Sequence, residues 1–93
     1  MNARYVLSDY IEQAIARAVY DKLDDGTFAG RIPMCKGVVA FAGTLRECEQ
    51  ELRSVLEDWI LLGFKLKHRL PVIAGINLNQ EPGHEPLVAL QTA

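Results

Sequence analysis

The most regular pattern along the chain is a stripe of apolar residues between Leu45 and Ile60, at spacings of three and four. Such spacing places the apolar side chains on one face of a helix. Thr44 precedes the stripe and Glu47 follows three residues later, which is the capping-box pattern of a helix N-terminus. Gly63 is predicted to end the helix, because glycine is common just after a helical C-terminus. The stripe comprises Leu45, Cys48, Leu52, Val55, Leu56, Trp59 and Ile60.

The rest of this helix divides into a polar face and a few apolar residues that fall off the stripe. Glu49 and Arg53 have the i,i+4 spacing of a stabilising ion pair on the polar face. Trp59 stands at the end of the stripe, so we expect it in the core. The apolar residues off the stripe are Leu61, Phe64 and Leu66. These would form an exposed apolar surface.

Three segments before the helix have the pattern of strands. Residues 19–23 alternate in polarity, and Asp24-Asp25-Gly26 supplies the tight turn of a hairpin whose second strand is 27–32. Pro33 ends that strand, and Gly37 closes the next loop with a conformation that other residues resist. Residues 38–42 are apolar on both sides. This pattern favours a central strand, or one covered on both faces.

Both ends of the chain have weaker patterns. Ser8 or Asp9 would cap a short helix through Ile15. Residues 70–76 would add a short strand, which Pro71 confines to an edge. The sequence thus predicts an α+β fold, with a small antiparallel sheet covered by one long amphipathic helix and preceded by a short helix. Residues 1–76 form the predicted domain, and residues 77–93 have the composition of a tail.

Length and charge limit the classes of function. A chain of 93 residues has enough sequence for one domain, and its apolar fraction of 49% is that of a folded protein. The 12 acidic and 10 basic residues give a net charge of −2. A generic nucleic-acid binder would carry a basic surplus. This balance instead suits a protein that meets a basic partner.

Cellular location is predicted from segments that the sequence lacks. No apolar stretch has the length of a membrane span, and the N-terminus has no apolar signal core. Cys35 and Cys48 form neither a Cys-x-x-Cys pair nor a disulfide framework. We expect Cys48 to be buried on the helix stripe, whereas Cys35 lies in a predicted loop where it could be exposed. Two reduced thiols fit the cytoplasm.

The carboxylates do not form the pattern of a nuclease site. Two-metal hydrolysis needs several carboxylates converging on ions about 4 Å apart. Asp24 and Asp25 lie at a predicted hairpin tip, and Asp21 alone lies within a strand. The other candidates, Glu47, Glu51 and Asp58, lie along the polar face of the helix. A solvated helix face explains those acids. We therefore expect no enzyme activity.

Metal ligands and activated nucleophiles are not suggested either. His68 and His84 are sixteen residues apart and far from both cysteines, which is not a zinc spacing. No serine or cysteine has a nucleophile context, and no glycine-rich phosphate loop follows a strand. We expect neither a metal site nor a cofactor.

One basic cluster stands out, at the end of the long helix. Its members are Lys65, Lys67, His68 and Arg69. Such a cluster would contact phosphates or an acidic partner. Cations at a helical C-terminus also complement the helix dipole, and this structural role is the favoured interpretation.

The order of these elements resembles the HicB family of antitoxins. The resembling stretch runs from about Tyr10 to Ile76 and includes Val19-Tyr20-Asp21-Lys22-Leu23-Asp24-Asp25-Gly26-Thr27-Phe28-Ala29-Gly30-Arg31-Ile32-Pro33 and Gly37-Val38-Val39-Ala40-Phe41-Ala42-Gly43-Thr44-Leu45-Arg46-Glu47-Cys48. It continues through Leu56-Glu57-Asp58-Trp59-Ile60 and Leu70-Pro71-Val72. The loop Met34-Cys35-Lys36-Gly37 departs from the family, which commonly has a second proline there.

This resemblance implies a partial ribonuclease-H-like β-β-β-α-β fold and a role in silencing a HicA-like, mRNA-cleaving toxin by direct binding. Many members carry a DNA-binding module after this domain. Nothing after Ile76 is long enough for one, so we do not expect sequence-specific DNA binding. The alternative is a self-assembling structural or regulatory module without a toxin partner, and we expect homo-oligomers. For a cationic partner, the predicted contact residues are Asp24, Asp25, Glu57 and Asp58.

Overall fold

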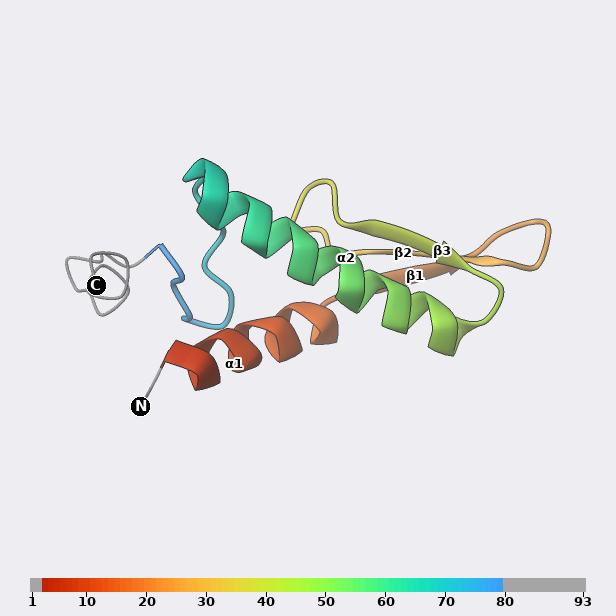
Figure 1. Cartoon of the computed structure of the whole chain (residues 1–93). Helices are drawn as coiled ribbons and strands as arrows, with labels where there is room; N and C mark the ends of the chain where they lie inside the picture. Colours follow the sequence, from red (N-terminus) through yellow and green to blue (C-terminus); the bar gives the residue numbers. More distant parts are fainter. Residues whose placement is uncertain (1–2, 80–93) are drawn as a thin grey trace.

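One long helix covers one face of a three-stranded antiparallel sheet, and a shorter N-terminal helix packs alongside it (Figure 1). This computed structural model describes residues 3–79. The elements are α1 (Ala3–Ala16), β1 (Val19–Lys22), β2 (Phe28–Arg31), β3 (Val39–Ala42) and α2 (Leu45–Leu66). The α+β layout predicted from the sequence is confirmed.

The β1–β2 hairpin forms around the Asp-Gly turn, as predicted. Gly26 has φ +88°, a left-handed conformation that glycine adopts without steric cost. The Leu23 N–H donates to the Thr27 carbonyl oxygen at 2.7 Å and closes the turn. Tyr20 is paired with Gly30, and Gly30 with Ala40, across the three strands. These three residues therefore share the face that α2 covers, where Gly30 contributes no side chain.

The prediction that residues 38–42 form a central or doubly covered strand is wrong. The strand order is β1-β2-β3, so β3 is an edge strand. Within residues 3–79 only one of its faces is covered: Ala40 is buried, whereas Val39 and Phe41 are 43% and 64% exposed. An apolar run has the same pattern whether both faces of its strand are covered or one apolar face stays exposed. The sequence alone therefore could not decide between the two.

Helix α2 begins as predicted but ends later. The Thr44 hydroxyl accepts a hydrogen bond from the Glu47 backbone N–H at 3.1 Å, which caps the first turn. Gly63 does not end the helix, which continues to Leu66, where Lys67 at φ 59° forms a left-handed C-cap. Gly63 is instead buried, with Leu70 Cδ2 2.7 Å from where a Cβ would be. Glycine here permits close packing of the returning chain.

The core lies between the sheet, α2 and α1. Its largest fully buried side chains include Tyr10, Ile32, Leu52, Leu56, Ile60 and Ile73. Cys48 is buried as predicted, and Cys35 is buried too, although its loop position left exposure open. Trp59 is only partly buried and packs against the edge of the core. Its place at the end of the stripe, where α2 passes beyond the sheet, explains this difference.

Helix α1 starts at Ala3, ahead of the predicted caps Ser8 and Asp9. The Tyr10 hydroxyl donates to the Pro71 carbonyl oxygen at 2.8 Å and ties this helix to the segment after α2. That segment forms no regular strand: its pairing is reduced to a single bridge between Ile73 and Ile76. A bridge between residues so close in sequence is a tight turn, so it adds no strand to the sheet.

The first residues of the predicted tail pack back on the domain. The Asn79 side chain accepts a hydrogen bond from the Leu70 N–H at 2.7 Å and donates to the Leu70 carbonyl oxygen at 2.6 Å. The rest of the tail, including His84, lies outside the described residues. Between residues 3 and 79, neither helix has the length and apolarity needed to cross a membrane.

Candidate interaction surface

The outer edge of β3 offers unpaired backbone groups. Within residues 3–79, β2 is the only strand paired with β3. The Ile32 N–H donates to the Val38 carbonyl oxygen at 3.3 Å, which fixes the phase of the ladder. Because hydrogen-bonded and non-bonded pairs alternate in an antiparallel sheet, the N–H and C=O groups of Val39 and Phe41 point away from β2. We call this feature the open edge.

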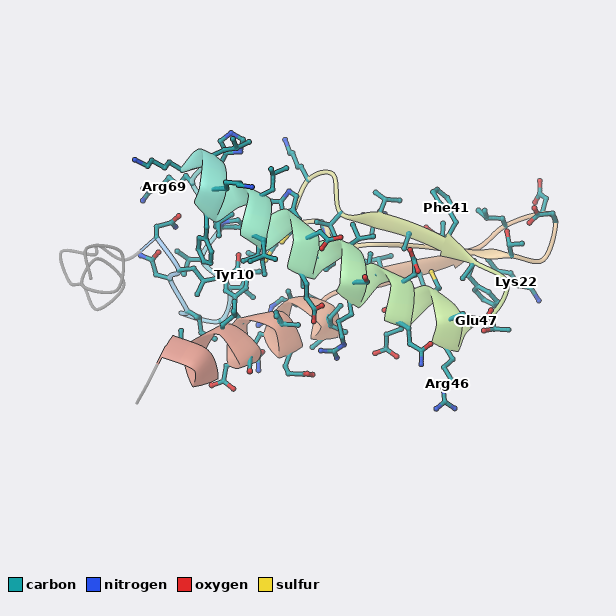
Figure 2. All side chains as sticks on the ribbon, in the orientation of Figure 1. Tyr10, Lys22, Phe41, Arg46, Glu47 and Arg69 are labelled. Carbon is teal, nitrogen blue, oxygen red and sulfur yellow. The ribbon has the colours of Figure 1, made fainter. Side chains whose placement is uncertain are left out.

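The same two residues present apolar side chains on the outer face of the sheet. Phe41 stands on the side of the sheet opposite α2 (Figure 2). Its neighbours on that face in the paired strands are Ala29 and Asp21, while Arg31 and Val19 lie beside Val39. Val19, Val39 and Phe41 are all exposed. Backbone donors and acceptors and an apolar side-chain surface thus meet at β3.

The rotation of α2 about its axis follows from contacts with β1 and α1. Gly30 leaves space for the Tyr20 ring, whose carbon atoms lie 2.9 Å from a Cβ placed there, and for Cys48 Sγ of α2, which lies 3.1 Å from it, so α2 approaches the sheet closely. Burial and the nearby Glu49 carboxylate raise the pKa of Tyr20, in that order of size. Arg53 donates to both Glu12 carboxylate oxygens, at 2.8 and 3.3 Å. Glu49 and Arg53 therefore mark the side of α2 that faces β1 and α1.

The Arg53–Glu12 ion pair replaces the pairing expected from the sequence. Glu49 has the spacing to pair with Arg53, but the guanidinium bonds to Glu12 in α1. The hydrogen bond from Arg53 lowers the pKa of Glu12, and the same bond raises that of Arg53. The helical spacing correctly placed Arg53 beside an acid, yet it could not show that α1 brings a second one.

The opposite flank of α2 carries a line of acids that starts beside the open edge. Glu47, Glu51 and Asp58 are spaced by four and seven residues, so they lie in one row along the helix. All three are exposed. The row starts at the end of β3, because Glu47 Oε1 lies 3.8 Å from the position of a Cβ on Gly43 (Figure 2). We call these three residues the acidic row.

The four acids predicted to contact a partner fall in three places. Asp24 and Asp25 lie at the tip of the β1–β2 hairpin, which projects past the start of α2 (Figure 1). The Asp25 carboxylate accepts hydrogen bonds from the Thr27 hydroxyl at 2.6 Å and the Thr27 N–H at 3.0 Å, and these bonds lower its pKa. Asp58 belongs to the acidic row. Glu57, one residue earlier, turns toward α1.

Two shallow recesses lie along α2. One, of about 250 Å³, runs between the two helices and is lined by Leu7, Ile11, Ile60 and Leu61, with Glu57 as its charged residue. We call it the interhelical groove. The other lies beside Trp59 and Leu70, near the basic cluster, whose members His68 and Arg69 line it. All four members of the basic cluster are exposed around the C-terminus of α2.

Within residues 3–79, the titratable groups suit contact with a partner better than catalysis. Burial raises the pKa of the Cys35 thiol to about 11 and also raises that of Cys48, so both thiols are protonated at neutral pH. Residues 3–79 contain no group of three or more histidine, cysteine or acidic side chains arranged to hold a metal ion. The exposed acids and the open edge are the features that a partner protein would meet.

The open edge is the part of this surface that the sequence did not reveal. Its pattern was visible as an apolar run without any charge between Val38 and Ala42. Such a run is equally typical of a buried strand, and the strand order that exposes it is a property of the whole fold. The sequence identified the acidic row as part of a polar helix face. Its position at the end of β3 could not be predicted, because it depends on how α2 is oriented about its own axis in the folded structure.

Comparisons with known proteins agree with this architecture. The model of the UPF0150-like family matches residues 9–71. The crystal structure of TTHA0281 from Thermus thermophilus superposes with a TM-score of 0.75 at 34% sequence identity. The match covers 82% of this chain and 95% of that one. The comparison with curated proteins gave no match.

Proposed function

We propose that this chain, which belongs to the UPF0150-like family, is an antitoxin-type binding module that neutralises a HicA-like, mRNA-cleaving toxin in the cytoplasm by direct contact. The resemblance to HicB antitoxins supports this proposal, because its first four elements, β-β-β-α, agree with the observed sheet and helix. The strand expected after them is replaced by a turn in residues 70–76. The two buried, unbridged thiols are compatible with a reducing compartment.

The observation that carries the proposal is the acidic row that starts beside the open edge. Exposed apolar side chains and unpaired strand groups suit a protein partner. Exposed acids next to them favour a basic partner and speed its encounter. A toxin that cleaves RNA needs a cationic surface for its substrate. A protein that covers such a surface would itself be acidic where the two meet.

The predicted contact residues differ in how well their positions fit this role. Asp58 lies in the acidic row, and Glu57 lies at the interhelical groove, whose apolar lining would take the aliphatic stem of a lysine or arginine. Asp24 and Asp25 stand apart at the hairpin tip, where Asp25 already stabilises its own turn. We propose Glu57 and Asp58 as the main contacts, with the hairpin acids at the periphery.

Co-expression with the product of a neighbouring gene that encodes a small basic protein tests the proposal. We expect the chain to relieve growth arrest by that protein and to co-purify with it at nanomolar affinity or better, by analogy with tight pairs of complementary charge. Asp58→Lys should weaken both effects. Asp9→Lys, an exposed acid of α1, serves as the matched control. Growth arrest that persists with abundant folded chain would refute the proposal.

A second candidate, a self-assembling module, is favoured by the apolar residues at the end of α2. Leu61, Phe64 and Leu66 are 62%, 41% and 52% exposed, as their positions off the stripe predicted. If they form an interface between copies, sedimentation equilibrium should show an oligomer that Leu61→Glu dissociates. A purified chain that stays monomeric at high micromolar concentration would exclude this candidate.

A further inference from the structure

We propose that the open edge of β3 binds an extended, basic segment of the partner by strand addition, and that this segment alternates apolar and cationic side chains. The inference rests on the proposed function in that it names how the partner docks.

The two edge strands of the sheet, β1 and β3, differ in the charge of their side chains. At the other edge, β1 carries the charged side chains of Asp21 and Lys22, which discourage pairing with another strand. Within β3, residues 39–42 contain no charge and no proline. Proteins usually protect an exposed strand edge with such residues. An edge left without them is suited to receive a further strand.

The residues on the two faces of the sheet at the open edge determine which side chains an added strand should carry. Successive side chains of a strand point to opposite faces of the sheet. On the outer face they would meet Val39 and Phe41, so apolar side chains fit there. On the α2 face they would approach Glu47 and Glu51 of the acidic row, so lysine or arginine fits. The alternation of apolar and cationic residues follows from these two environments.

The same charges argue against a second copy of this chain as the occupant. An antiparallel β3–β3 pairing would place two α2 helices side by side on one face of the joined sheet. Each would present Glu47 and Glu51 to the other across the two-fold axis. Like charges brought together in this way are destabilising. A basic segment removes that repulsion.

Peptides with defined patterns test this inference on the purified full chain. The probe is a capped hexapeptide of alternating lysine and valine, and the controls are a block peptide of the same composition and an alternating glutamate–valine peptide. We expect only the alternating basic peptide to bind well. In hydrogen exchange, it should slow the backbone amides of Val39 and Phe41, because strand addition pairs the groups that point outward.

Charge reversal at matched positions of α2 separates the flank beside the open edge from the flank that faces β1 and α1. Glu51→Lys should weaken binding of the alternating basic peptide about tenfold, a change equivalent to about 1.4 kcal/mol. Glu49→Lys, an equal charge change on the other flank, should leave that affinity unchanged. Val39→Pro removes an outward N–H and should abolish binding, and circular dichroism would confirm that each variant folds.

Three results of these binding experiments would overturn the inference. The first is equal binding of the block and alternating peptides, and the second is protection confined to the interhelical groove. The third is concentration-dependent protection of Val39 and Phe41 without peptide, which would identify a second copy as the occupant. Toxin neutralisation that survives Glu51→Lys and Val39→Pro would refute strand addition while preserving the proposed function. Specific peptide binding without neutralisation of any neighbouring toxin would reject only the proposed function.

Discussion

At the scale of single residues, two tyrosine hydroxyls differ in whether they form a hydrogen bond. The Tyr10 hydroxyl is bonded to the Pro71 carbonyl oxygen, whereas the buried Tyr20 hydroxyl has no hydrogen-bond partner within the described residues. A satisfied buried hydroxyl contributes to stability, and an unsatisfied one costs free energy. Substitutions that remove only the hydroxyl should therefore act in opposite directions.

We expect Tyr10→Phe to lower the free energy of unfolding by about 1–2 kcal/mol, because the Pro71 carbonyl loses its donor. Tyr20→Phe should be neutral or slightly stabilising, since it removes a hydroxyl that makes no bond. Urea unfolding at neutral pH measures both changes. A loss in Tyr20→Phe as large as in Tyr10→Phe would show that its hydroxyl is bonded in solution.

The raised pKa of Tyr10 also predicts a dependence of stability on pH. Burial, and then the nearby Cys35 thiol, raises the pKa of Tyr10 from 10.0 to about 12. A group whose pKa is raised by folding contributes stability that is fully present below pH 10 and is lost as the pH approaches 12. The unfolding free energy of the unmodified chain should fall over this range. In Tyr10→Phe this contribution to the fall should be absent, as parallel urea titrations would show.

Trp59 illustrates how partial burial changes the expected cost of a substitution. A fully buried tryptophan would cost about 3–5 kcal/mol on truncation to alanine. Because Trp59 is only half-buried at the end of the core, we expect Trp59→Ala to cost about 1–3 kcal/mol. Leu56→Ala, at a fully buried position of the same helix, should cost more. The reverse order in thermal or urea unfolding would place Trp59 at the centre of the core.

At the scale of elements, α2 shows what its own sequence determines. The Thr44 cap and the buried stripe from Cys48 to Ile60 were predictable, because each depends on residues within a few positions of one another. The end of the helix was not, because Gly63 resembles a stop signal. Its burial depends on Leu70, which returns across the helix. Sequence signals at a helix end are overridden where tertiary packing needs a residue without a side chain.

Gly63→Ala tests this explanation. Alanine would gain up to about 1 kcal/mol of helix propensity. Its Cβ would stand 2.7 Å from Leu70 Cδ2, however, and the displacement of Leu70 from the core should cost about 1–3 kcal/mol. We expect a net destabilisation of about 1 kcal/mol in urea unfolding. Gly63→Ala combined with Leu70→Val should recover part of this loss. A stabilised single variant would mean that Leu70 moves aside freely.

In the sheet, too, features set by neighbouring residues could be predicted, whereas features set by the whole fold could not. The β1–β2 hairpin and its turn followed from Asp24-Asp25-Gly26, a signal contained in three residues. The position of β3 at the edge depends on whether residues 70–76 add a fourth strand, and in the described structure they form only a turn. The candidate site inherits this limit. Its acids were recognisable individually, but the position of the row Glu47, Glu51 and Asp58, which starts at the end of β3, is produced by tertiary structure.

At the scale of the whole molecule, charge is distributed unevenly along α2 and the segment that follows. Residues 45–58 contain the acids Glu47, Glu49, Glu51, Glu57 and Asp58 against the bases Arg46 and Arg53. Residues 59–69 contain no acid, and their bases are Lys65, Lys67 and Arg69 with His68 beside them. The net charge of −2 conceals this polarity. The N-terminal part of α2 is thus acidic and suited to a basic partner. The C-terminal end of α2 and the residues after it are basic and would attract any polyanion.

This polarity predicts weak nucleic-acid binding that carries no sequence information. Three exposed cations at the end of α2 would neutralise about three phosphates, so the logarithm of the affinity should fall against the logarithm of salt concentration with a slope of about −3 or shallower. Lys65→Gln combined with Lys67→Gln should flatten the slope further. A mobility-shift titration of the purified chain against its own promoter and against an unrelated duplex makes the measurement. Tight, promoter-selective binding at physiological salt would contradict the prediction, because cations gathered at a helical C-terminus contact phosphates without reading the edges of the bases.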